Sequence, residues 1–135
     1  MAKSIQSFWS DKKHVALFGF SRNPASVSRQ VYNIMTGKGY QIYPINPHTN
    51  HIAGLKCYTN LNEIEQKLDA AIIITNPKIT AEIIKQCHQR GLNELWFQFD
   101  TMDDEVKNYL AKNSMSYLYA CILQYSHLIN AVENK

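Results

Sequence analysis

VALFGFSRNP, residues 15–24, joins an apolar, partly β-branched run to a glycine and then to small polar and cationic residues. This order is typical of a strand that ends in a nucleotide-binding turn and is followed by a helix. The dinucleotide-binding fingerprint G-x-G-x-x-G contains three glycines, whereas this stretch contains only Gly19. The stretch therefore predicts a strand, a turn and a helix, and it raises the question of what a turn with one glycine holds.

Short apolar runs alternate along the chain with segments of helical periodicity. The runs expected to form strands are residues 14–19, 41–46, 69–75, 94–99 and 117–121, with a short edge strand at 55–61. Helices are expected at residues 27–37, 62–67, 79–91, 104–110 and 128–132. Pro44 fits its strand only where the sheet needs no backbone donor. Strands and helices that alternate in this way predict a mainly parallel sheet with helices on both faces.

We therefore expect residues 1–135 to form a single doubly wound, Rossmann-like α/β domain with about five strands. The composition agrees, because 45% of the residues are hydrophobic and 19% are charged, which are values of globular domains. The net charge of +3 comes from scattered residues rather than from a basic cluster, so a nucleic-acid surface is not predicted. The longest apolar run, 70–74, is too short for a membrane span. A cytoplasmic protein without membrane contact is the expectation.

Metal and covalent catalytic sites are not predicted. Cys57, Cys87 and Cys121 are odd in number and lack C-x-x-C spacing, so neither a disulfide framework nor a zinc site is indicated. Cys121 at a strand end is either a reactive thiol or a buried core residue, and burial is the commoner state of free cysteine. His48 and His51 have no cysteine or carboxylate neighbours to complete a metal site. GFSRN is not the nucleophile elbow G-x-S-x-G.

The loop after the first strand has the chemistry of an anion site. In doubly wound folds, ligands bind beyond the carboxyl ends of the strands, where the strand order reverses. Ser21 offers a hydroxyl, Arg22 a cation and the chain near Ser26 the first amides of a helix, where the helix dipole favours anions. The alternative is an ordinary strand-to-helix loop that turns at Asn23-Pro24.

Two further loops follow strands of the predicted sheet. NAD enzymes usually place an acid after the second strand to bind the ribose hydroxyls, whereas this chain has Asn46-Pro47-His48. The loop therefore favours coenzyme A or NADP over NAD as a ligand. The alternative interpretation of Asn46-Pro47 is a plain β-turn without a binding role. After the third strand, Asn76-Pro77 is followed by Lys78. This lysine either meets a phosphate or is a solvated residue at a helix start.

Taken together, the motifs resemble a known family. They are GFSRNP at 19–24, YPINP at 43–47, GLKCY at 54–58 and GLNELWFQ at 91–98. Their order and spacing resemble the small standalone coenzyme A-binding domain proteins, which are similar to the coenzyme A-binding domain of the succinyl-CoA synthetase α subunit. The resemblance runs from about Val15 to Cys121.

The resemblance implies roles for particular residues. Contacts to the nucleotide phosphates are implied for Gly19, Phe20, Ser21 and Arg22. Contacts to the adenosine end are implied for Asn46, Pro47 and His48, and closure over the ligand for Asn76, Pro77 and Lys78. Gln98 matches the glutamine of the family's W-L-Q-P-G motif and is expected at the same site.

The sequence departs from the family at two places. Phe99-Asp100 stands where the family has Pro-Gly, and Cys121 is followed by Ile122 instead of proline. Asp100 is expected either to face the pyrophosphate and repel it, or to begin the next helix as its cap. Both departures are expected on the ligand side of the domain.

The sequence thus favours a non-catalytic module that binds coenzyme A or an acyl-CoA, a small nucleotide ligand. One alternative is an enzyme or enzyme subunit that uses NADP or an adenine nucleotide. Another is a protein-interaction module whose nucleotide pocket has decayed, with Phe99 and the altered region near Ile122 obstructing it. A protein partner is compatible with each of these hypotheses, and the sequence does not identify it.

Overall fold

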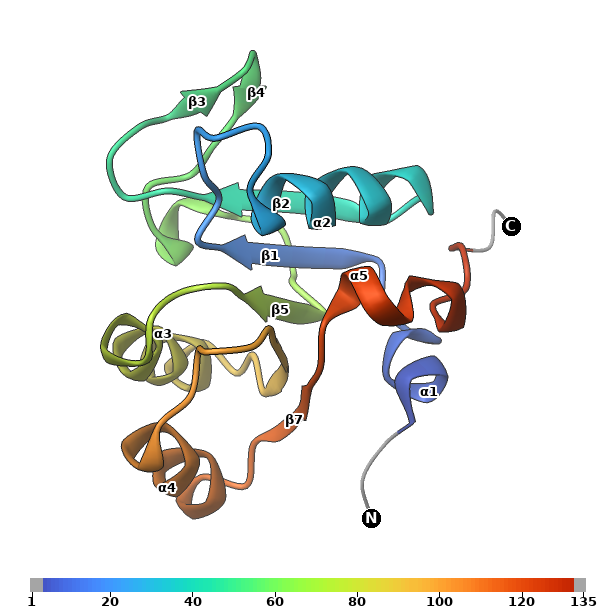
Figure 1. The fold of residues 1–135 in the computed structure, drawn as a ribbon. Helices are drawn as coiled ribbons and strands as arrows, with labels where there is room; N and C mark the ends of the chain where they lie inside the picture. The colour runs from blue at the N-terminus through green and yellow to red at the C-terminus, as the bar shows by residue number, and fades with distance from the viewer. Residues whose placement is uncertain (1–3, 133–135) are drawn as a thin grey trace.

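A parallel five-stranded sheet forms the centre of the molecule, a computed structural model that describes residues 4–132 (Figure 1). Its strands are β1 (His14–Phe18), β2 (Gln41–Ile45), β5 (Ala70–Ile73), β6 (Glu94–Phe97) and β7 (Ser116–Tyr119). Their order is β2-β1-β5-β6-β7, and all neighbouring pairs are parallel. The order reverses between β1 and β5, as in doubly wound folds. The predicted fold class is confirmed.

Helices cover both faces of this sheet (Figure 1). They are α1 (Ile5–Trp9), α2 (Val27–Gly37), α3 (Pro77–Gln89), α4 (Asp104–Lys112) and α5 (Ile122–Tyr125). One buried core contains side chains of α1, α2 and α5, and the other contains those of α3 and α4. Successive residues of β1 alternate between the two cores, as a strand covered on both sides requires. None of the helices described is long and apolar enough to cross a membrane.

Side-chain caps fix where the three longest helices begin. Ser26 accepts a hydrogen bond from the Arg29 amide at the start of α2, and Asn76 and Asp103 cap α3 and α4 in the same way. Such caps stabilise a helix by about 1 kcal/mol each. Asp100 therefore does not cap α4, so one of its two expected roles is wrong. The backbone of Asp100 is in the left-handed region, with a φ of 64°.

Pro44 lies in β2 without interrupting the sheet. The Gln41 amide donates to Lys13, so in this ladder alternate residues face β1 and Pro44 faces the outer edge, where it needs no amide. Outside it, the Tyr58 amide donates to the Pro44 carbonyl at 2.8 Å. The expected edge strand at 55–61 is otherwise wrong, because only β4 (Leu55–Lys56) is extended and it pairs with β3 (His51–Ile52) in a separate hairpin.

Two expected helices are absent from the described chain. At 62–67 the chain forms only a 3₁₀ turn (Leu61–Glu63). The Arg90 guanidinium donates hydrogen bonds to the carbonyls of Leu61, Ile64 and Gln66. At 128–132 the chain leaves a 3₁₀ turn (Ser126–Leu128) and binds Lys38. The Lys38 ammonium donates to the Ile129 carbonyl at 2.8 Å, and the Val132 amide donates to the Lys38 carbonyl at 2.7 Å. In both places a distant residue takes backbone groups that a helix would use.

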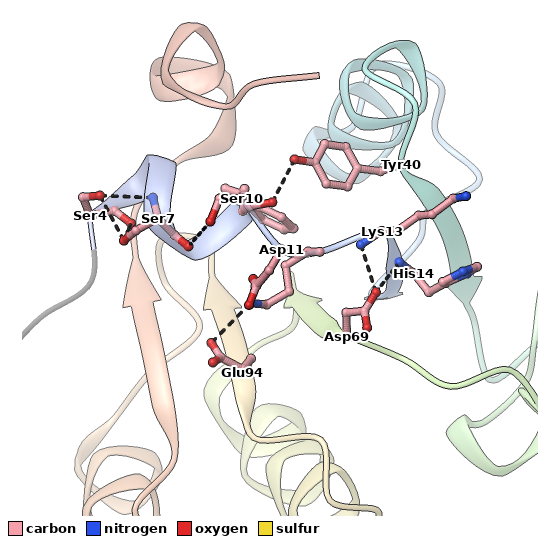
Figure 2. Close-up of polar contacts among 11 residues, drawn as sticks. Ser4, Ser7, Ser10, Asp11, Lys13, His14, Tyr40, Asp69 and Glu94 are labelled. Carbon is pink, nitrogen blue, oxygen red and sulfur yellow. Dashed lines mark hydrogen bonds and ion pairs between the residues drawn. The ribbon is translucent and has the colours of Figure 1, made fainter. Parts of the chain in front are cut away.

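The short helix α1 was not expected from the sequence, and it closes the amino-terminal ends of the strands (Figure 2). Its Phe8 and Trp9 are buried against Trp96. The Tyr40 hydroxyl donates to the Trp9 carbonyl at 3.3 Å, and the Asp69 carboxylate accepts from the backbone amides of residues 13 and 14, each at 2.9 Å (Figure 2). Five residues are too few for helical periodicity to be recognised in a sequence.

The three cysteines differ in burial. Cys57 and Cys87 are buried, and burial raises the pKa of both thiols, that of Cys87 to about 12. Cys121 is only half-buried, so its expected burial is incomplete. Because the thiolate is the reactive form, the two buried thiols are doubly protected, by their surroundings and by their protonation at neutral pH.

We expect a thiol reagent such as a maleimide to modify Cys121 first at neutral pH in the native protein. Cys57 and Cys87 should react only after denaturation, because both side chains are buried and burial raises the pKa of each thiol, which disfavours the reactive thiolate. Time-resolved mass spectrometry measures the order of labelling. Cys121→Ser should remove the fast reaction, and equal labelling rates for all three thiols would contradict the described burial.

Candidate functional site

Gly19 is the residue at which the carboxyl end of β1 meets the carboxyl end of β5. Its φ of 92° lies in the left-handed region, and a Cβ at this position would be 2.2 Å from the carbonyl oxygen of Ile74. No other residue type fits both the backbone angle and the space. The single glycine of the first loop is therefore needed for the turn itself, at the point where the strand order reverses.

The loop that follows Gly19 is held by its own small polar side chains. The Ser21 amide donates to the buried Ser28 hydroxyl at 2.9 Å, and the Asn23 amide donates to the Ser21 hydroxyl at 3.0 Å. The Ala25 amide in turn donates to the Asn23 side chain at 3.0 Å. The loop thus has one fixed path into α2 and turns at Asn23, while its expected role as an anion site stays a prediction.

Arg29 supports this loop from within. Its guanidinium donates to the carbonyls of Ser21 and Arg22, at 3.4 and 3.2 Å, and lies 5.5 Å from the centre of the Phe20 ring. Phe20 itself is buried. The sequence did not predict this role for Arg29. The side chain of Arg22, whose carbonyl Arg29 binds, is exposed to solvent.

Asn46 connects the second loop to the first. Its side-chain amide donates to the Phe20 carbonyl at 2.9 Å, and its side-chain oxygen accepts from the His48 amide at 2.8 Å. An aspartate here would have no N–H to offer the Phe20 carbonyl. The residue that replaces the usual acid therefore joins the two loops, and it leaves Pro47 and His48 exposed.

A cleft of about 460 Å³ lies at the carboxyl ends of β1, β2 and β5. Its walls combine apolar side chains with a polar rim, as is common in ligand sites of this size. The lining residues are Phe18, Gly19, Phe20, Ser21, Ile45, Asn46, Pro47, His48, Thr59, Asn60, Thr75, Ile79, Glu82, Ile83 and Gln86. Six of the expected site residues are brought together here: Gly19, Phe20, Ser21, Asn46, Pro47 and His48.

The other lining residues were not expected from the sequence. Thr75 directly precedes the Asn-Pro motif, and Ile79 and Ile83 lie on the predicted helix face. The periodic apolar pattern of α3 was the one signal in the sequence that could have pointed to Ile79. This residue belongs to the apolar pattern, but it is 50% exposed and lines the cleft. Thr59 and Asn60 follow the small hairpin and carry no motif.

A second cavity, of about 650 Å³, lies between the first loop and the β3–β4 hairpin, which Figure 1 shows beyond β2. Its lining residues are Arg22, Pro24, Arg29, Thr49, His51, Ile52 and Ala53. Ser21 lines the cleft and Arg22 lines this cavity. Consecutive residues of the first loop therefore border two different spaces, of which the second is lined by the two arginines Arg22 and Arg29.

The remaining expected site residues do not line the cleft. Asn76 caps α3, Pro77 occupies its first turn and Lys78 is exposed. Gln98 is buried, and its side-chain oxygen accepts from the Trp96 indole at 3.2 Å and the Ile122 amide at 2.8 Å. Gln98 thus joins β6 to the start of α5.

The two sequence departures also lie outside the cleft lining. Phe99 is exposed and packs against Tyr119, with ring centres 5.4 Å apart. The Asp100 amide donates to the Tyr119 hydroxyl at 3.1 Å. Phe99 therefore does not obstruct the cleft.

Comparison with known proteins gives a consistent family. Residues 13–126 match the family model described as CoA binding domain. The chain is 36% identical over 85 residues to Acetate–CoA ligase [ADP-forming] II of Archaeoglobus fulgidus, a match that covers 59% of this chain and 12% of the ligase. It is 21% identical over 125 residues to the uncharacterized protein YneT of Bacillus subtilis, covering 93% of each.

Solved structures agree with this result. A conserved hypothetical protein from Pyrococcus furiosus superposes with a TM-score of 0.74 at 30% identity, covering 79% of this chain and 92% of that one. A hypothetical protein from Pyrococcus horikoshii gives a TM-score of 0.82 at 23% identity, covering 95% and 99%. The chain thus spans nearly all of these small proteins, but only a small part of the ligase.

Gly19→Ala should destabilise the fold strongly. The left-handed backbone costs an L-residue about 1–2 kcal/mol, and the new methyl group would collide with the Ile74 carbonyl. Gly37→Ala is the matched control, since a Cβ there meets nothing within 4 Å, and it should leave the free energy of unfolding unchanged or raise it by about 0.5 kcal/mol. Urea unfolding measures both variants, and equal stabilities would refute the close approach at Gly19.

Proposed function

The chain belongs to the CoA-binding domain family, and from this premise we propose that it binds coenzyme A in the cleft at the carboxyl ends of β1, β2 and β5. The observation that carries the proposal is the meeting of the first and second loops around this cleft, joined by the hydrogen bond from Asn46 to Phe20. Family membership names the ligand, and the loops supply groups suited to its parts.

The first loop is proposed to hold the phosphates. Gly19 lets the loop begin directly beside the end of β5, Ser21 offers its hydroxyl, and the start of α2 directs amides and a helix dipole toward the loop. Arg22 adds an exposed guanidinium, which can hold a phosphate through two parallel hydrogen bonds. Arg29 keeps its guanidinium on the loop carbonyls and therefore shapes the site from behind.

The second loop is proposed to contact the adenosine end through Asn46, Pro47 and His48. The cleft wall beside this loop includes the apolar side chains of Ile45, Ile79 and Ile83, which suit an aromatic base. Residues 46–48 contain no carboxylate, so the loop does not repel a phosphorylated ribose. Thr75 brings the third loop to the cleft, while Asn76, Pro77 and Lys78 are proposed to border the ligand from outside.

We propose that the domain binds its ligand without catalysing a reaction on it. The A. fulgidus relative is named as a ligase, but this chain matches only 12% of its length, so that activity is not transferred here. The neighbouring cavity, which Arg22 and His51 help to line, offers room for further anionic groups of the ligand. An acyl group on the thiol end is compatible with the proposal.

Thermal unfolding with a ligand panel tests this proposal. Coenzyme A or acetyl-CoA should raise the melting temperature most, by an amount equivalent to about 2.7 kcal/mol when the ligand is at 100 times its Kd. Dephospho-coenzyme A is the control and should give a smaller shift, because it lacks the 3′-phosphate. NAD, NADP and ATP should have smaller effects. A larger shift with NADP or ATP than with coenzyme A would favour the enzyme alternative and overturn the proposal.

Arg22→Ala should weaken coenzyme A binding about tenfold, which corresponds to about 1.4 kcal/mol. The reason is the loss of a guanidinium from the loop proposed to hold the phosphates. Lys78→Ala removes another exposed cation, one that lines neither the cleft nor the cavity beside the first loop, and should have a smaller effect. Titration calorimetry measures both, and the reverse order would contradict the assignment of the phosphates to the first loop. Both variants should melt like the unaltered protein.

A further inference from the structure

β7 is an edge strand whose outer backbone groups face away from the sheet. The Ser116 amide donates to the Asn93 carbonyl and the Ala120 amide to the Phe97 carbonyl, both at 3.0 Å. Because backbone groups alternate in direction along a strand, Leu118 also faces β6 in this register. Tyr117 and Tyr119, which lie between these residues, therefore direct their amides and carbonyls outward.

The two edges of the sheet differ in their protection. At the β2 edge, Pro44 removes an outward donor, and Tyr58 forms hydrogen bonds with the Pro44 carbonyl and the Asn46 amide. β7 is short, with the sequence Ser-Tyr-Leu-Tyr, and it contains neither proline nor a charged residue, which are two of the usual devices against edge pairing. Within the part of the chain that the structure describes, no segment pairs with its outer side.

Aromatic side chains accompany this open edge. Tyr117 is 41% exposed, Tyr119 45% and Phe99 48%. Tyr117 packs edge-on against the buried Phe97 at 5.7 Å, and Tyr119 packs against Phe99. Together with the backbone of β7, the side chains of Phe99, Tyr117 and Tyr119 form what we call the β7 edge surface.

We propose that the β7 edge surface pairs with the same surface of a second copy of the chain. A twofold axis at Leu118 would place Tyr117 of each copy opposite Tyr119 of the other in an antiparallel pair. The residues that direct backbone groups outward would then be the ones that exchange hydrogen bonds, and the aromatic side chains would form cross-strand pairs on one face. Such an interface is self-complementary, as a twofold dimer requires.

The charges beside β7 favour a second copy over another partner. α4 returns alongside the sheet from Asp104 to Lys112, and the exposed acids Asp103, Asp104 and Glu105 lie at its start. Two exposed lysines follow: Lys107, which lies beside Tyr117 and Tyr119, and Lys112 at the end of the helix. Antiparallel pairing places the start of α4 in one copy toward the end of α4 in the other. The acidic start of each α4 would then approach the basic later part of the other, which parallel pairing would not achieve.

Light scattering after size-exclusion chromatography, over a series of protein concentrations, tests the proposal. The mass should rise from 15.6 kDa toward twice that value as concentration increases. Tyr117→Lys places a charge on the edge and should raise the dimer Kd at least tenfold. Tyr125→Lys is the matched control, because Tyr125 is 38% exposed but lies on α5, away from β7, and it should associate like the unaltered protein.

Amide hydrogen exchange on the unaltered protein gives a second readout that does not depend on the folding of a variant. The amides of Tyr117 and Tyr119 should become more protected as protein concentration rises. A mass that stays at 15.6 kDa throughout would overturn the proposal. It would equally fail if Tyr117→Lys folded and associated normally, if Tyr125→Lys dissociated the dimer to the same extent, or if the two amides kept constant protection.

Discussion

The contact between Gly19 and the carbonyl of Ile74 is the constraint on which the candidate site depends. The Ile74 amide donates to the Phe18 carbonyl at 3.0 Å, so β1 and β5 remain paired until the last residue before the loops begin. A side chain at position 19 would separate these ends. Its absence lets Phe20 return into the core and brings Ser21 to the cleft. One glycine is thus enough, because the turn needs a close approach of two strand ends at a single point.

Two polar side chains then fix the loops that the glycine brings together. Arg29 binds the carbonyls of the first loop, and Asn46 binds the Phe20 carbonyl from the second. Both residues satisfy backbone acceptors that would otherwise need water at the mouth of the cleft. A loop ordered in this way loses less conformational freedom when a ligand binds. The division of labour between Arg29 and Arg22 follows, since one guanidinium holds the loop and the other is exposed.

The sequence predicted the parts of the structure that depend on local pattern. Buried strands such as Ala70–Ile73 and capped helices such as Pro77–Gln89 have recognisable signals within a short window. The failures at 62–67 and 128–132 have one cause: backbone groups there bind Arg90 and Lys38, which are distant in the sequence. At the site, loop residues 19–21 and 46–48 were predicted from their position after strands, and they line the cleft. Thr59 and Asn60 reach the cleft only through the path of a small hairpin.

The departures from the family at Phe99 and Asp100 acquire a different meaning in three dimensions. From sequence both were expected on the ligand side, with a role as helix cap as the alternative for Asp100, yet both residues contact Tyr119 on the last strand. Asp100 adopts a φ of 64°, a conformation that glycine adopts without strain and aspartate tolerates better than most residues. The backbone path of a glycine is therefore compatible with the new side chain. Asp100 thus adopts a conformation that suits glycine, neither Phe99 nor Asp100 lines the cleft, and Phe99 enlarges the aromatic surface beside β7.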